Sequence, residues 1–432
     1  MLCHDYIASI IVDRAIFILQ NEKIENQAEI IMTTNNPQFS TKILDYIRSM
    51  NMKKIGLITF HASHNNGSML QALALQTILI QHYGCKTEII DFSNPGQRNM
   101  YAPLPKADNW KRVIKNLIWL TQYKQILKQY NAYNCFSQKY FILTKKKYKY
   151  SNELRELDGK FDAVIAGSDQ VWNIACRDAD DAYYLNFLEK TSKYGYAVSF
   201  GANNPFTLDG KNEIHKKLVE QFSQISVREN NAKKWIRETL GKEVPICLDP
   251  TMLLNAEQWE NLVDIGTSPI IKGDYIYYYC FSITEDVQRF LKWLSKKNNM
   301  PVYFMEAKEW TLKMCWRNRI KLIRSYGPDV YMNVVKYSNI FITTSFHGTA
   351  FATIFKKNFW YISDGKVNKN DDRAQSFLTQ LGLMGRYKTI KELMATDISR
   401  SPDYTDPYIK LAELQKFSYA YLNGIINEIK EL

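Results

Sequence analysis

The sequence lacks the residue spacings that mark metal centres. Its 7 cysteines are odd in number and scattered, and they form neither a Cys-x-x-Cys pair nor a cluster with histidine. Such spacing argues against a structural zinc site and favours free thiols in a reducing cytoplasm. We therefore expect a cytoplasmic protein without a bound metal ion.

Long apolar runs are missing too. A membrane-spanning helix needs roughly 18 consecutive apolar residues, and the nearest stretch, residues 7–19, is interrupted by Asp13 and Arg14. That stretch also lacks the basic start and the small-residue cleavage site of a signal peptide. The sequence therefore predicts neither a membrane span nor a secretory leader.

The chain has fewer acidic than basic residues: 44 Asp and Glu against 56 Lys and Arg give a net charge of +12. This balance indicates an anionic ligand, a nucleic acid or an anionic lipid. The lysines are spread widely, with one tight run at residues 145–149, and neither a zinc-finger spacing nor a recognition helix accompanies them. We expect no nucleic-acid partner. An anionic small substrate and peripheral contact with the inner face of a membrane both fit the charge.

The chain is long enough for two hydrophobic cores. It has 432 residues, of which 46% are hydrophobic and 23% charged, as in ordinary soluble globular proteins. Alternating strand-like and helix-like segments predict two parallel α/β units with a cleft between them. We expect a first domain (52–254), a linker (255–273) and a second domain with a closing helix (274–432). Residues 1–51 are expected to be an N-terminal extension outside the core fold, or to precede a working start at Met52.

The first expected strand, residues 55–60, leads into a polar loop that ends at a helix expected over residues 69–83. Asn66, Gly67 and Ser68 stand at the start of that helix, where free N–H groups favour anions. Neither GxGxxG nor a Walker A pattern accompanies them. The loop is therefore either a phosphate cradle or an ordinary turn.

A second polar junction follows the buried strand expected over residues 161–166. It presents carboxylate, amide and indole groups together, which are the groups that bind sugar hydroxyls and pack on the apolar face of a pyranose. The alternative is an Asp-capped helix start with a tryptophan in the core. The candidate sugar-binding residues are Gly167, Ser168, Asp169, Gln170, Trp172 and Asn173.

A third junction joins the strand expected over residues 340–343 to a helix over residues 349–355. It carries hydroxyls, an imidazole and free helix N–H groups at the carboxyl edge of a sheet, where α/β folds bind ligands. The alternative is that the histidine merely caps the helix. The candidate residues here are Ser345, His347, Gly348 and Thr349.

Two arginines are candidate ligands for a carboxylate or phosphate. Arg228 ends the strand expected over residues 224–228, and Arg373 begins a helix. A protein carboxylate is the alternative partner of each. Residues 244–254 are expected to form a further strand that leaves through Asp249-Pro250-Thr251.

The segment 109–130 is expected to be one basic amphipathic helix. Its apolar residues alternate with lysine and arginine at helical spacing. It either docks on the domain by its apolar side or lies on an anionic membrane.

Several motifs in order resemble the polysaccharide pyruvyl transferase family. They are MKKIGLITF with NNGSMLQALAL at the opening, GSDQVWN at 167–173, the VR that ends at residue 228, LDPTMLL at 248–254 and TTSFHGTAFA at 343–352. The resemblance runs from Met52 to the C-terminus. It implies a GT-B-like fold of two Rossmann-like domains facing a cleft. It also implies transfer of pyruvyl from phosphoenolpyruvate to a sugar of a cell-surface polysaccharide or its precursor, as a ketal, with release of phosphate and without a cofactor.

Under this interpretation Arg228 and the helix start at Gly348 and Thr349 hold the anionic donor. His347 transfers the proton, because an unperturbed imidazole titrates near neutrality. Asp169 is the base or orienter of the acceptor hydroxyl. Trp172 and Asn173 seat the sugar.

One departure from the family pattern concerns Ser345, which stands where better-studied members have an arginine, two residues before the motif histidine. Either Arg228 and Arg373 hold the anion instead, or the substrate differs. Two other functions stay open. They are a GT-B-type glycosyltransferase using a nucleotide sugar, and a non-catalytic scaffold in polysaccharide assembly. A lipid-linked sugar acceptor and a homo-oligomer also stay open.

Overall fold

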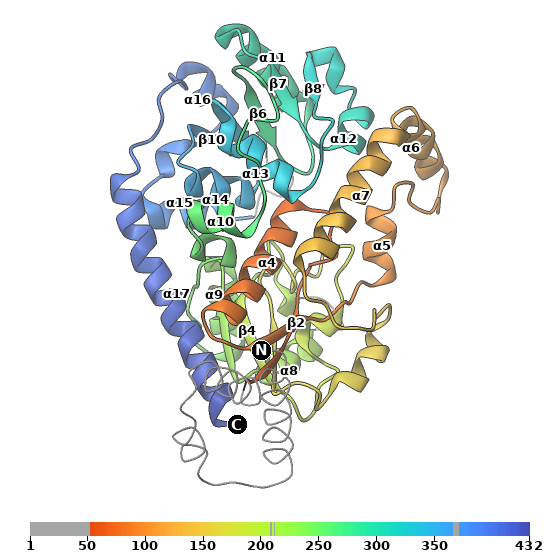
Figure 1. The fold of residues 1–432 in the computed structure, drawn as a ribbon, viewed down its shortest axis with the longest axis vertical. Helices are drawn as coiled ribbons and strands as arrows, with labels where there is room; N and C mark the ends of the chain where they lie inside the picture. Colours follow the sequence, from red (N-terminus) through yellow and green to blue (C-terminus); the bar gives the residue numbers. More distant parts are fainter. Residues whose placement is uncertain (1–51, 208–209, 211, 366–370) are drawn as a thin grey trace, which may run out of the picture.

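The computed structural model describes residues 52–207, 210, 212–365 and 371–432 (Figure 1). Two parallel sheets, each covered by helices, lie one above the other along the long axis of the molecule. The N-terminal extension expected over residues 1–51 lies outside the described residues. The two sheets confirm the predicted α/β class.

The N-terminal sheet has five parallel strands in the order β2-β1-β3-β4-β5. The order reverses direction between β1 and β3, so the loops that follow these two strands separate and leave a crevice at the carboxyl edge. Residues 61–65 and 167–173 form those loops. The strands are β1 (Lys54–Ile58), β2 (Lys86–Ile89), β3 (Ala163–Ala166), β4 (Ser192–Val198) and β5 (Gln224–Val227).

Helices of the N-terminal half pack on both faces of this sheet. Helix α4 is almost entirely buried, because apolar residues occupy most of its positions. The helices are α4 (Asn66–Gln81), α5 (Pro95–Tyr101), α6 (Trp110–Leu120), α7 (Tyr123–Tyr140), α8 (Asn212–Glu220) and α9 (Asn230–Leu240), with the short 3-10 helices η1 (Ser151–Leu157), η2 (Asp181–Tyr184) and η3 (Pro205–Thr207).

Two expectations about this half were wrong. The single helix expected over residues 109–130 is two helices, because α6 ends at Leu120 and the chain turns before α7 buries its own apolar face. The strand expected over residues 244–254 is only an isolated bridge between Val227 and Ile246. The chain then enters the 3-10 helix η4 (Pro250–Leu253), whose first residue is a proline that cannot donate to a sheet ladder.

The C-terminal sheet has six parallel strands in the order β11-β10-β9-β6-β7-β8. Its direction reverses between β6 and β9, so the junction after β9 stands at the equivalent crevice of this sheet. The strands are β6 (Ile276–Tyr279), β7 (Val302–Phe304), β8 (Ile320–Leu322), β9 (Ile340–Thr343), β10 (Phe359–Ile362) and β11 (Tyr387–Lys388). The helices are α11 (Glu285–Asn298), α12 (Ala307–Leu312), α13 (Pro328–Tyr337), α14 (Phe346–Ile354), α15 (Arg373–Leu381) and α16 (Ile390–Ala395), with η5 (Cys315–Asn318) and η6 (Met384–Arg386).

The last helix, α17 (Thr405–Glu431), runs from the C-terminal half down the side of the N-terminal half (Figure 1). Its side chains bond to the backbone around η4. Gln415 Nε2 donates to the Met252 carbonyl at 2.7 Å, and Ser418 Oγ accepts from the Leu248 amide at 3.0 Å. Helix α17 therefore ties the end of the first half to the second.

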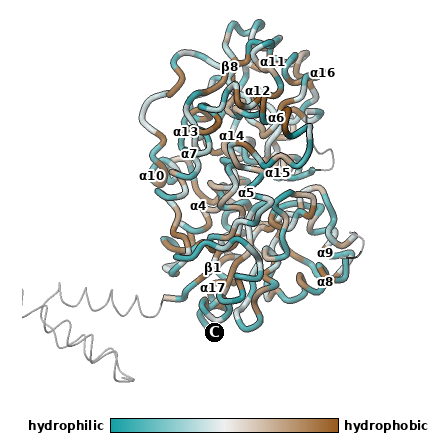
Figure 2. Tube along the Cα trace, turned by 90° about the vertical axis from the view of Figure 1, so that its right-hand side faces the viewer, coloured by the Kyte–Doolittle hydropathy of each residue, from teal (hydrophilic) through white to brown (hydrophobic). Residues whose placement is uncertain are grey.

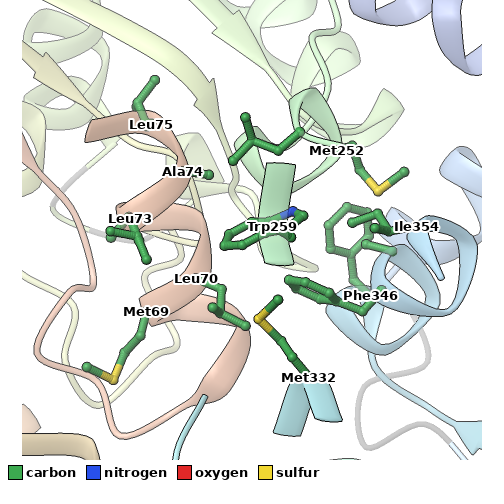
Figure 3. Close-up of a cluster of buried hydrophobic side chains, with 14 of the residues drawn as sticks. Met69, Leu70, Leu73, Ala74, Leu75, Met252, Trp259, Met332, Phe346 and Ile354 are labelled. Carbon is green, nitrogen blue, oxygen red and sulfur yellow. The ribbon is translucent and has the colours of Figure 1, made fainter. Parts of the chain in front are cut away.

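One hydrophobic core extends through both halves (Figure 3). Trp259 of α10 (Ala256–Leu262) lies at its centre, fully buried, and its Nε1 donates to the Thr251 carbonyl at 3.0 Å. Side chains from α4, η4, α13 and α14 surround it, among them Met69, Leu70, Met252, Met332, Phe346 and Ile354. Burial of such side chains stabilises by about 1.5–3 kcal/mol each. This shared core holds the two carboxyl edges face to face.

Helix α6 lies against α12 of the other half in two views (Figures 1 and 2). Across the described ranges, no helix combines the length and apolarity that crossing a bilayer requires.

Candidate functional site

The junctions after β1 and β9 contact each other across the two halves. Asn65 caps α4, and its Oδ1 accepts from the amides of Gly67 at 3.0 Å and Ser68 at 3.3 Å. A Cβ on residue 67 would lie only 2.1 Å from Nδ1 of His347. Glycine at position 67 is therefore what lets the imidazole of α14 approach the start of α4.

A buried network of charged side chains lies behind this contact. Arg228 follows β5 and forms ion pairs with Asp249 and with Asp169, whose Oδ1 is 3.3 Å from Nη2. Its guanidinium also lies 4.6 Å from the ring centroid of Phe346. On the other side, His347 Nε2 is 3.3 Å from Asp249 Oδ2. Asp249 thus links an arginine of one half to the histidine of the other.

Both carboxylates of the network have a lowered pKa. Burial by itself would raise the pKa of Asp169 and Asp249, but the positive charges of His347 and Arg228 outweigh it. The pKa of Asp249 lies far below its usual range. The two groups are therefore anions at neutral pH.

Hydroxyl groups fix the carboxylates in place. Ser68 Oγ donates to Asp169 Oδ2 at 2.5 Å, and Thr251 Oγ1 donates to Asp249 Oδ1 at 2.7 Å. Ser168 Oγ donates to the Ala197 carbonyl at 2.8 Å and also lies 3.4 Å from Asp249 Oδ2. Buried charges are stable only when hydrogen-bonded in this way.

A cavity of about 600 Å³ opens in front of the network, between the two carboxyl edges. It is walled by both halves, and we name it the charged cavity. The predicted residues that line it are Ser68, Asp169, Gln170, Asn173, Ser345, His347 and Arg373. Those that lie behind its wall are Asn66, Gly67, Gly167, Ser168, Trp172, Arg228, Gly348 and Thr349.

Trp172 is not a sugar platform, in contrast to the expectation. Its indole is buried in the core of the N-terminal half, where it stacks on Tyr184 with ring centroids 4.9 Å apart. Its Nε1 donates to the Tyr183 carbonyl at 2.9 Å. Of the alternative interpretation, an Asp-capped helix start with a core tryptophan, the core tryptophan agrees with the structure, whereas no helix begins after Asp169.

Arg228 does not face the cavity either. Its guanidinium is engaged by two protein carboxylates and is buried, so it cannot also offer a bidentate face to a ligand. Arg373 does line the cavity, with Nε 2.9 Å from Asp371 Oδ1 and its terminal nitrogens 2.9 Å from the side-chain amide of Gln170. Of the two arginines predicted from the sequence, Arg373 is therefore the one that lines the cavity, where it pairs with Asp371.

The start of α14 offers fewer free donors than expected. The Gly348 amide points to Ser345 Oγ at 3.4 Å, and the Thr349 amide donates to the Ser345 carbonyl at 3.1 Å. Glycine at 348 is required by packing, because a Cβ there would lie 2.2 Å from Thr343 Oγ1. Ser345 thus acts as the cap of α14 and lines the cavity with its remaining surface.

Sequence reasoning missed two residues of the site. Asp249 was recognised only as part of the LDPT motif, although its carboxylate connects Arg228 with His347. The available signal was a carboxylate after an apolar run, followed by Pro and Thr that hold it in a turn. Arg177, in the loop after β3, also lines the charged cavity. Among the described residues, no set of three His, Cys, Asp or Glu side chains is placed to hold a metal ion.

A second cavity, of about 300 Å³, lies between α5–α7 and α12, and we name it the aromatic cavity. It shares Met100, Tyr101, Arg177 and Phe281 with the charged cavity, so the two adjoin. The rings of His64 and Tyr133 stack in its wall with centroids 5.2 Å apart. Its other lining residues include Arg112, Lys115, Trp119, Tyr130, Glu306 and Lys308.

In the aromatic cavity, burial shifts the pKa of the ionisable groups in the direction that favours their neutral forms. Burial raises the pKa of Glu306 to about 7 and lowers that of Lys308 to about 8. Burial also lowers the pKa of His64 to about 4, so this imidazole is neutral. The cavity therefore combines aromatic surface with groups whose charge changes near physiological pH.

Several solved structures are similar to this chain. A protein of Listeria monocytogenes assigned as a UDP-N-acetylglucosamine 2-epimerase has 12% identity and a TM-score of 0.51, with 88% of this chain and 98% of that chain covered. A UDP-N-acetylglucosamine 2-epimerase from Rickettsia bellii has 11% identity, a TM-score of 0.47 and coverages of 88% and 98%. An E. coli heptosyltransferase with ADP-2-deoxy-2-fluoro heptose has 10% identity, a TM-score of 0.33 and coverages of 76% and 99%. The first likeness, which concerns the fold alone, confirms the predicted GT-B-like architecture.

A comparison with curated protein sequences found no match. The model of one family, described as polysaccharide pyruvyl transferase, matches residues 65–365. This span is more than half of the 432 residues and contains the junctions after β3 and β9 together with Asp249. The resemblance predicted from the motifs is confirmed, and the chain belongs to the polysaccharide pyruvyl transferase family.

Proposed function

We propose that this protein transfers the pyruvyl group of phosphoenolpyruvate to two hydroxyls of a saccharide, forming a cyclic ketal and releasing phosphate. The observation that carries the proposal is a single cavity whose wall combines the cation Arg373 with His347, whose imidazole contacts the ionised Asp249. Family membership supports a saccharide acceptor, either a cell-surface polysaccharide or its precursor.

The donor needs several positive groups, because phosphoenolpyruvate carries both a carboxylate and a phosphate. Arg373 and Arg177 line the charged cavity from opposite halves of the chain. Ser345 stands where the resemblance leads us to expect an arginine, and it caps α14 instead. We therefore assign the anion-binding role to Arg373, in place of Arg228.

The chemistry begins with a proton added to the methylene carbon of the donor. One acceptor hydroxyl then attacks the central carbon, and a second hydroxyl displaces phosphate by breaking the bond between that carbon and the bridging oxygen. Of the two hydroxyl protons, one balances the proton gained by the methylene carbon and the other leaves with phosphate. We assign the first proton to His347.

Two features suit His347 to this role. Its Nε2 lies 3.3 Å from Oδ2 of the ionised Asp249, which holds the ring in place. Its Nδ1 lies beside Gly67, where the lack of a side chain makes room for the ring between the two halves. Asp169, which accepts from Ser68 and lines the same cavity, is placed to orient an acceptor hydroxyl.

The aromatic cavity is the site that we assign to the acceptor. Tyr101, Tyr130 and Trp119 line it, and aromatic rings are groups on which the apolar side of a pyranose packs. Because this cavity adjoins the charged cavity, a saccharide in it would place its terminal residue beside the donor. Gln170 and Asn173, at the wall of the charged cavity, supply amide groups for the hydroxyls of that residue.

Calorimetry and turnover together test this function. We expect wild-type protein to bind phosphoenolpyruvate, and Arg373→Ala to weaken binding about tenfold or more because a charge-assisted contact is lost. Arg373→Lys should restore part of it. His347→Ala should bind the donor normally but release phosphate about 10²-fold more slowly. Arg289→Ala, which removes an exposed arginine on α11, is the matched control and should change neither quantity.

The same experiment distinguishes the alternatives. A protein that binds a nucleoside diphosphate but not phosphoenolpyruvate would be a nucleotide-sugar glycosyltransferase. A protein that binds neither would support a scaffold. Full turnover in His347→Ala would leave the donor assignment intact and remove His347 from the chemistry.

A further inference from the structure

Helix α6 turns its apolar side chains away from the protein. Trp110 is 68% exposed and Leu117 is 60% exposed, whereas Trp119 is buried. Trp119 Nε1 donates to the Lys308 carbonyl at 3.0 Å, and its ring contacts the Lys308 ammonium at 5.1 Å. The exposed apolar residues of the helix are Trp110, Val113, Ile114, Leu117 and Leu120. One anchored tryptophan thus fixes which side of α6 faces outward.

The exposed residues form one continuous stripe. A helix turns by about 100° per residue, so the spacing of these five residues places them within a single face, opposite Trp119. Lys111 is exposed and stands beside the stripe, next to Ile114, whereas Lys115 lies on the side of Trp119. Helix α6 carries no acidic residue. An apolar face beside lysines is the pattern of a helix that lies in the interface of a bilayer.

We propose that α6 docks this protein on a lipid bilayer that contains anionic phospholipid. The apolar stripe enters the boundary between headgroups and acyl chains, and Lys111 contacts the anionic headgroups. The net charge of +12 favours the same surface. The alternative retained from the sequence, in which this helix docks on its own domain by its apolar side, is excluded by the exposure of that side.

The position of α6 connects this surface to the cavities. Arg112, Lys115 and Trp119 of α6 line the aromatic cavity, and α6 packs on α12. A protein docked through α6 therefore holds that cavity next to the bilayer. If the proposed acceptor is carried on a membrane lipid, its saccharide reaches the aromatic cavity without leaving the surface. The docking itself does not depend on which reaction the protein performs.

Vesicle flotation tests the proposal. We expect the full chain to float with vesicles of phosphatidylglycerol and phosphatidylcholine, to bind vesicles of phosphatidylcholine alone at least about tenfold more weakly, and to detach at high salt. The double variant Trp110→Ser/Leu117→Ser and the charge-reversal variant Lys111→Glu should each lose at least about tenfold in binding. Exposed Ile409 and Phe417 on α17 supply the matched control, Ile409→Ser/Phe417→Ser, which should float like wild type.

Several outcomes would overturn the proposal. They are failure of the wild type to float, equal binding to both vesicle types, or an equal loss in the α17 control. Light scattering is measured in parallel. If the α6 variants convert a dimer to a monomer while the wild type ignores vesicles, the surface is an interface between two copies instead. If one of the two α6 variants unfolds at the same temperature as wild type, its loss of vesicle binding is not caused by misfolding. Binding of phosphoenolpyruvate is measured separately.

Discussion

The two cavities hold their charges in different ways. Behind the wall of the charged cavity, Arg228 and His347 both contact Asp249, and in its wall Arg373 pairs with Asp371. In the aromatic cavity, Glu306 has an amide donor, Gln129 Nε2 at 3.0 Å, and its pKa rises to about 7 because burial prevails. Paired charges keep their ionisation over a wide pH range, whereas a carboxyl with only a neutral partner gives up its charge.

This difference has a functional consequence. The charged cavity keeps the same electrostatic field across neutral pH, which suits a site that must hold an anionic donor and a proton donor in fixed places. The aromatic cavity changes its charge between mildly acidic and mildly basic pH, which suits recognition by rings and hydrogen bonds. Substitutions at three residues test this difference between the two cavities.

Removing the charge of Asp249 should have the largest effect. Asp249→Asn leaves Arg228 buried with one carboxylate and removes the anion that contacts His347. We expect a loss of about 3 kcal/mol in the free energy of unfolding and of about 10³-fold in turnover, measured by urea unfolding at pH 7 and by phosphate release.

The pH dependence of the free energy of unfolding tests whether the charge of Asp249 causes this loss of stability. The folded pKa of Asp249 lies below its unfolded value, so its stabilisation is present above about pH 4 and is lost as the pH falls below that. Asp249→Asn should lack this part of the acid-induced loss. The surface variant Asp286→Asn, which breaks an exposed pair with Arg289, should cost less than about 1 kcal/mol. Equal costs in the two variants would refute the buried network.

Adding a methyl group at Gly67 should have the next largest effect. Gly67→Ala places its Cβ 2.1 Å from the present position of His347 Nδ1, so the ring must move. A displacement near 1 Å costs about 10²-fold in turnover, which steady-state kinetics would measure. Gly385→Ala, where a Cβ meets no atom within 4 Å, is the control. Unchanged turnover in Gly67→Ala would show that the reaction does not require His347 at its present position.

Glu306 should show the smallest effect, with the opposite dependence on pH. Its folded pKa, about 7, lies above its unfolded value, so the folded protein keeps a proton that the unfolded chain releases. Stability should therefore fall as the pH rises from about 4.5 to about 7, by on the order of 1 kcal/mol because the side chain is partly exposed.

The variant Glu306→Gln should remove this slope, because an amide keeps the bond to Gln129 and cannot ionise. Urea unfolding at pH 5, 6 and 8 measures it. Exposed Glu285→Gln should keep the wild-type profile. A wild type whose stability rises over this range would mean that Glu306 is ionised in the folded state.

Much of the site could be read from local patterns. The junctions after β1, β3 and β9 are polar, follow apolar strands, and meet at the carboxyl edges as parallel sheets require. Ser68, Asp169 and His347 were identified on this basis, and all three line one cavity. The family was recognisable for the same reason, because its motifs are short and contiguous.

For Trp172, Arg228 and α6, the local sequence pattern fits two interpretations and does not decide between them. An indole after an aspartate fits either a sugar platform or a core, and only the packing of Tyr184 and Phe200 around Trp172 decides for the core. An arginine at a strand end fits either a ligand or a protein acid. Asp249 reaches Arg228 from a different segment, and no spacing in the sequence reveals that pairing.

The sequence by itself determined the two parallel α/β halves, the polar junctions and the family, because the periodicity of apolar residues and the chemistry of short motifs are properties of neighbouring residues. The tertiary structure decided which charges are paired, which rings are buried and which face of α6 is exposed. Those outcomes depend on distances between segments far apart in the chain, and the energy of a charge or an apolar surface is set by whatever the fold brings within a few ångströms of it.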